Sequence, residues 1–70
     1  MFYDRLNDIC KNQNLKITNV LKELNISMGN TSKWKNGTIP NGKILILLAD
    51  KLGVSVDYLL ERTNNPEVNK

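Results

Sequence analysis

The 70-residue chain has no histidine and a single cysteine, Cys10. One cysteine cannot form a disulfide within the chain, and the usual zinc sites of cysteine and histidine cannot be assembled. We therefore expect no metal and no cofactor. Because free cysteines usually behave as small buried apolar residues, we interpret Cys10 as part of the apolar face of the first helix.

Long apolar runs are also missing. No segment approaches the roughly 18 consecutive apolar residues that a membrane span requires, and residues 1–4 lack the basic flank and cleavage site of a signal peptide. We expect a cytoplasmic protein with no membrane partner. At this length, with 40% apolar residues, the chain is near the lower limit for a single core, so one small domain is expected.

Acidic residues are scarce in the middle of the chain. Between Lys11 and Lys43 the sequence holds six lysines and one acid, Glu23, whereas each flanking segment has a net charge of −1. The net charge of +3 is therefore concentrated in the central segment. Such a concentration indicates either an anionic partner or lysines that only solvate exposed faces.

Apolar residues recur at helical spacing in several short segments. The spacing predicts helices that begin at Phe2, at Ile17, after Asn41 and after Ser55. The expected inward residues are Phe2, Leu6, Ile9 and Cys10, then Ile17, Val20, Leu21 and Leu24, then Leu45, Leu48, Ala49 and Leu52, then Tyr58, Leu59 and Leu60. These helices predict an all-α bundle over residues 1–62, followed by a flexible polar tail over residues 63–70.

Turn residues and helix caps mark the ends of these helices. Asn25 tolerates the left-handed backbone at the end of the second helix, and Gly53 follows the fourth. Asn41 and Ser55 are expected N-caps, and Val54 and Leu59 have the spacing of a hydrophobic staple. The fourth helix places Leu47 on its outer side and Ile46 near the border, so a partner or solvent is expected at Leu47.

A short central helix, from about Met28 to Asn36, is the most polar and cationic of the five. Ser27 is a suitable N-cap and Gly37 a suitable C-terminal stop. Thr31 and Trp34 lie three residues apart on one face, so Trp34 is expected in the core rather than as a stacking platform. Because only about two turns fit between cap and stop, neighbouring helices must hold this one in place.

An ordered set of segments resembles the Cro/C1-type helix-turn-helix family of phage and bacterial repressors. The segments are Leu24-Asn25-Ile26-Ser27, Trp34-Lys35-Asn36-Gly37, Pro40-Asn41 and residues 48–60, LADKLGVSVDYLL. The resemblance implies a lambda-repressor-like bundle that places its third helix in the major groove, as a homodimer on a pseudo-palindromic operator of double-stranded DNA. It implies no small-molecule substrate.

Some positions depart from the family pattern. Lys16 stands where a helix-capping serine is common, and Ile17 stands where a phosphate-contacting glutamine is common. Either Lys16 reaches the phosphate itself, or Thr18 caps a slightly later start. Thr31 replaces the usual inward apolar residue, so the third helix is expected to be held less firmly.

Within this resemblance, the residues that start the third helix meet base edges. The base-contacting candidates are Met28, Gly29, Asn30, Ser32 and Lys33. Lys33 is the strongest of them, because an ammonium can donate to guanine O6 and N7, whereas Met28 offers apolar contact to a thymine methyl. The phosphate-contacting candidates are Lys16, Ser27, Lys35, Asn36 and Lys43.

Two other functions compete with DNA binding. A protein-interaction module of the antitoxin or antirepressor type would use Ile46, Leu47 and the last helix. The same last helix, with Tyr58, Leu59, Leu60 and the outer Leu47, is the candidate self-contact of a dimer, unless these side chains fill the core. An enzyme is not expected, because no nucleophile and base or pair of carboxylates converges in the sequence.

Overall fold

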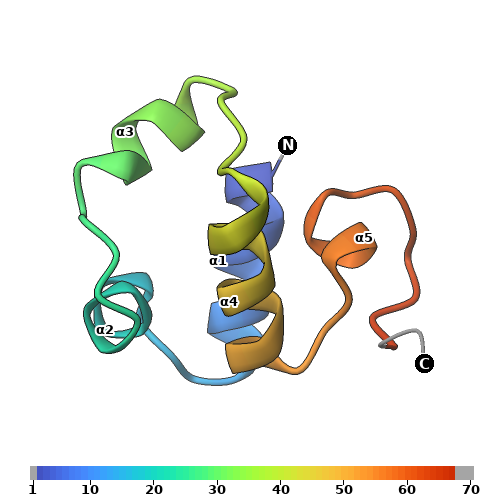
Figure 1. Cartoon of the computed structure of the whole chain (residues 1–70). Helices are drawn as coiled ribbons and strands as arrows, with labels where there is room; N and C mark the ends of the chain where they lie inside the picture. The colour runs from blue at the N-terminus through green and yellow to red at the C-terminus, as the bar shows by residue number, and fades with distance from the viewer. Residues whose placement is uncertain (1, 68–70) are drawn as a thin grey trace.

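Residues 2–67 are described by a computed structural model, and within that range they form five helices and no strand. The helices are α1 (Phe2–Asn12), α2 (Ile17–Glu23), α3 (Asn30–Lys35), α4 (Gly42–Leu52) and α5 (Val56–Leu59). Figure 1 shows α2 and α3 on one side of α1 and α4, and α5 on the other side. The predicted all-α bundle is confirmed.

All five helices contribute to one apolar core. α1 contacts α2, α3 and α5, and α4 contacts α5. The predicted stripes of α1 and α4 are buried in full, as are Val20 and Leu21 of α2. Burial also raises the pKa of the Cys10 thiol, in accordance with its predicted place in the core.

The helices end in the same way, with one residue in the left-handed region that lets the chain turn back. These residues are Asn14, Asn25, Gly37, Gly53 and Glu61, with φ between 57° and 100°. At the end of α2 the amide of Asn25 donates to the carbonyl of Lys22, and that of Ile26 donates to Leu21. Because this pattern satisfies carbonyls that the helix leaves open, it stabilises each abrupt stop. The predicted roles of Asn25, Gly37 and Gly53 are confirmed.

The predicted N-caps of α4 and α5 are also confirmed. The Asn41 side chain accepts from the Ile44 amide at 3.0 Å, and Ser55 Oγ accepts from the Tyr58 amide at 3.0 Å. α2 begins at Ile17, so the alternative in which Thr18 caps a later start is wrong.

The third helix starts later than its sequence predicts. Regular helix begins at Asn30 rather than Met28, because the amides of Asn30 and Thr31 donate three residues back, to Ser27 and Met28. Gly29 is the N-cap of α3 and no side chain caps it, so the prediction of Ser27 as the N-cap of this helix is wrong. Ser27 Oγ instead accepts from the Gly29 amide at 3.3 Å, within the tighter turn that precedes α3.

The outer side of α4 differs from the prediction. Ile46 is 57% exposed, whereas Leu47 is half-buried in the hollow between α4 and the α2–α3 turn. The prediction of an outward Leu47 is therefore wrong. Leu59 is fully buried, so of the three apolar residues of the last helix it belongs to the core rather than to a surface available for self-contact.

Part of the expected tail contacts the bundle. The Ser55 amide donates to the Pro66 carbonyl at 2.9 Å, which brings the chain after α5 back to the start of that helix. Residues 68–70 lie outside the described range, and the domain boundary at residue 62 stays a prediction. None of the helices within residues 2–67 is long and apolar enough to cross a membrane.

Candidate nucleic-acid interface

The inner face of α3 is held by aromatic packing. Trp34 is 2% exposed, and its ring meets that of Phe2 edge to face, with centroids 5.5 Å apart and an interplanar angle of 86°. Ile26, in the turn before α3, is also buried. Thr31 is partly buried, and its hydroxyl donates to the Met28 carbonyl at 2.8 Å. The predicted core role of Trp34 is thus confirmed.

The remaining residues of α3 and the turn before it form an outer face open to a partner. Met28 is 43% exposed, and Gly29, Ser32 and Lys33 are exposed as well. The turn before α3 thus exposes an apolar methionine side chain, and α3 itself exposes a lysine cation and a serine hydroxyl. These groups match what base edges present in a major groove.

Asn30 differs from the other candidate base-contacting residues. It is partly buried, and its side-chain amide donates to the Ser27 carbonyl at 3.1 Å. This bond fixes the side chain against the turn that precedes α3. The side-chain oxygen of Asn30 and its second N–H remain for a partner.

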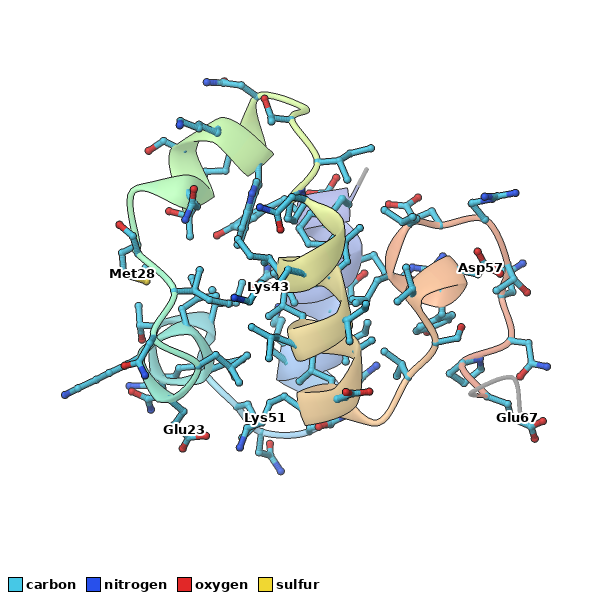
Figure 2. All side chains as sticks on the ribbon, viewed as in Figure 1. Glu23, Met28, Lys43, Lys51, Asp57 and Glu67 are labelled. Carbon is cyan, nitrogen blue, oxygen red and sulfur yellow. The ribbon has the colours of Figure 1, made fainter. Side chains whose placement is uncertain are left out.

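A hollow of about 470 Å³ separates the α2–α3 turn from the start of α4. Its polar lining includes Ser27, Asn30, Asn41 and Lys43, which brings two candidate phosphate-contacting residues together with one candidate for base contact. Figure 2 shows Met28 and Lys43 on the same side of α4, the side that carries α2 and α3. An anion here would meet the Lys43 ammonium next to the N-terminal end of α4.

The other candidate phosphate-contacting residues lie at the ends of α2 and α3. Lys35 is the last residue of α3, and its ammonium lies 5.5 Å from the centroid of the Tyr3 ring. Asn36 follows it and is exposed. Lys16 immediately precedes α2, is exposed, and lies outside the lining of the hollow that contains Lys43.

Several acidic residues lie away from the hollow beside α4. Glu23, the one acid of the central segment, forms an ion pair with Lys51 of α4. Asp57 and Glu67 lie on the opposite side of the molecule in Figure 2, and they line a second hollow together with Asp50 and the exposed Ile46. The hollow lined by Asp50, Asp57 and Glu67, called the acidic side below, is thus separate from the hollow that contains Lys43.

Comparison with known families decides what kind of protein this is. A model of the family described as "Helix-turn-helix" matches residues 6–59, which include all of α2 through α5. The chain belongs to the Cro/C1-type helix-turn-helix family. Neither a search of curated proteins nor a search of solved structures found a match.

Membership in this family makes the chain a DNA-binding helix-turn-helix protein. α2 and α3 are the two helices of the helix-turn-helix motif, and Asn25, with its left-handed backbone conformation, lies in the turn between them. Tyr3, whose ring lies against Lys35, was absent from the candidates drawn from the sequence. Nothing in the spacing of α1 points to it, because the contact joins residues far apart in the chain.

Proposed function

We propose that this helix-turn-helix protein is a sequence-specific transcriptional repressor that inserts α3 into the major groove of its operator. One observation carries the proposal: α3 buries Trp34 and leaves Ser32 and Lys33 exposed, and the turn before it leaves Met28 exposed. A short helix fixed on one side and polar on the other is suited to enter a groove as a rigid unit.

In this proposal the bases are recognised from the start of α3. Lys33 donates to guanine O6 or N7, and Met28 contacts a thymine methyl group. Gly29 has no side chain to contact a base, so it lets the backbone approach the base edges. Ser32 and the side-chain amide of Asn30 each add a hydrogen bond, which makes the recognition sparse, with Lys33 as its main determinant.

Phosphate contacts flank these base contacts and set the register of the protein on the duplex. Lys43 and Ser27 meet one phosphate at the hollow beside α4, and Lys35 and Asn36 meet another after α3. Lys16 reaches a third from the start of α2. Such contacts carry affinity but little sequence information, and each makes binding weaker at high salt.

A single domain of this size covers too little DNA for typical operator affinity. We therefore propose that the protein acts as a homodimer on a pseudo-palindromic operator, within the cytoplasm of a bacterium and encoded by the bacterium or a phage. The exposed Ile46 and half-buried Leu60 are the apolar groups that a second copy could cover.

Selection of bound sequences from a random duplex pool tests the proposal. The expected result is a pseudo-palindromic consensus, bound with an affinity that falls steeply as salt is raised. Sedimentation of the complex then gives the number of protein copies on each duplex. Failure to enrich any sequence, or a complex insensitive to salt, would contradict the proposal and favour a module that binds another protein.

A further inference from the structure

Two ring contacts join the first turn of α1 to the end of α3. The Phe2 ring meets Trp34 in the core, and the next residue of α1, Tyr3, lies under the ammonium of Lys35 at 5.5 Å. Tyr3 is partly buried and packs against the core, whereas Lys35 is exposed. The ring is therefore fixed by the bundle, and its negative face is offered to a flexible cation.

We propose that Tyr3 is a positioning residue for DNA binding, which holds the Lys35 ammonium where it meets a phosphate of the duplex. The inference rests on the proposed function. Lysine side chains lose much rotamer freedom when they are ordered. A ring that restricts Lys35 before binding reduces the entropy lost when the phosphate is bound, and this raises affinity without a new contact to DNA.

The geometry leaves the cation free for this second interaction. A ring occupies one side of an ammonium group, and the three N–H donors of lysine can still face a phosphate oxygen. Tyr3 therefore does not compete for the hydrogen bonds that the phosphate accepts.

A second pair of the same kind supplies a matched control. Arg5, two residues further along α1, lies over the ring of Tyr58 at 4.2 Å from its centroid. This pair joins α1 to the region of α5, which carries none of the candidate DNA-contacting residues. Removing the Tyr58 ring disturbs an equivalent packing contact of α1 but leaves Lys35 and its ring in place.

The test compares Tyr3→Leu, Tyr3→Phe and Tyr58→Leu for binding to a short duplex of random sequence, over a range of salt. We expect Tyr3→Leu to bind about two- to fivefold more weakly, with a salt dependence that approaches that of Lys35→Ala. Tyr3→Phe keeps the ring and is expected to bind as the wild type does. In a Lys35→Ala background, Tyr3→Leu is expected to have no further effect.

Unchanged or tighter DNA binding by Tyr3→Leu would overturn the inference. So would a loss of affinity from Tyr3→Leu that is as large in the Lys35→Ala background as in the wild type, or an equal loss of affinity from Tyr58→Leu. If the wild type binds no duplex, the proposed function itself fails. A measurement on the wild type avoids variants that do not fold. The ε-methylene protons of Lys35 should be shifted upfield by the Tyr3 ring and remain so in the DNA complex, and loss of that shift on binding would also overturn the inference.

Discussion

The ring of Phe2 meets the ring of Trp34 edge to face at 5.5 Å, and this contact ties the start of the chain to the proposed recognition helix. α3 has six residues, too few to be stable alone. Its orientation therefore depends on the burial of Trp34 against α1. The same contact places Tyr3 beside Lys35, so the core and the proposed DNA-binding face are built from neighbouring residues.

Replacement of Trp34 is expected to remove most of the stability of the domain. Truncating a buried tryptophan to alanine costs about 3–5 kcal/mol, whereas a domain of this size has roughly 4–10 kcal/mol in total. Urea denaturation of Trp34→Ala, followed by circular dichroism, measures the loss. Met28→Ala, at an exposed position of the same segment, should stay within about 0.5 kcal/mol of the wild type. Equal effects of the two changes would contradict the packing of α3.

The turn of the motif depends on the left-handed backbone of Asn25, whose φ is 57°. Alanine has no side-chain amide to support this conformation, so Asn25→Ala is expected to destabilise the domain by about 1 kcal/mol. Asn25→Gly should equal or exceed the wild type, because glycine adopts positive φ without strain. Thermal unfolding measures both. Asn7→Ala is the control, since Asn7 is exposed inside α1, where alanine favours the helix. The same loss from Asn25→Gly as from Asn25→Ala would argue against this role.

Lysines at the proposed interface should fall into two classes. Lys33→Ala is expected to relax base preference at one operator position, at a cost of about 1–3 kcal/mol on the specific site only. Lys35→Ala or Lys43→Ala should weaken binding to all sequences alike and reduce the salt slope by about one unit. Fluorescence anisotropy with operator and random duplexes separates these outcomes. Lys11→Ala, outside the candidate set, serves as the control for loss of one charge. Equal losses of Lys33→Ala on both duplexes would refute its assigned role.

Burial of Cys10 predicts both slow alkylation and a pH effect on stability. The pKa of its thiol is raised by burial, so the reactive thiolate forms less readily in the folded protein than in the unfolded chain. Iodoacetamide should therefore modify the folded protein slowly and the urea-unfolded chain rapidly.

Burial of Cys10 also makes the free energy of unfolding depend on pH. Because the pKa of the thiol is higher in the folded than in the unfolded state, the stability contributed by the protonated thiol is complete below an unfolded pKa of about 8.5. It is lost as pH rises through the folded value. In Cys10→Ala the free energy of unfolding should lack this pH dependence. Equal alkylation rates of Cys10 in the folded and unfolded states would contradict its burial.

Local features of the sequence predicted much of the fold. Asn41, Ser55 and Gly53 act on backbone groups within a few residues, so their roles follow from residue type and position. The core stripes of α1 and α4 follow from helical spacing in the same way. The sequence could not predict that Ile46 is the exposed side chain and Leu47 the half-buried one. Apolar residues lie on more than one side of α4, and the α2–α3 turn decides which of them is covered.

The contacts that the sequence did not predict join distant parts of the chain. Lys51 meets Glu23, and the partly buried Tyr3 meets Lys35, only because the fold brings together residues that are distant in the chain. The start of α3 also differs from the prediction, since the amides of Asn30 and Thr31 donate three residues back and the chain before Asn30 forms a tighter turn. For the candidate interface, the sequence identified the exposed side chains of α3, and the fold added the hollow shared by Ser27, Asn30 and Lys43.

The most direct test of the account is an NMR titration of the isotope-labelled protein with its selected duplex, in which every backbone amide reports its surroundings. We predict the largest shift changes at residues 27–36 and at Lys43, with small changes at Asp50 and Asp57 on the acidic side. Changes centred on that acidic side, with α3 unaffected, would contradict the assignment of α3 as the DNA-binding helix.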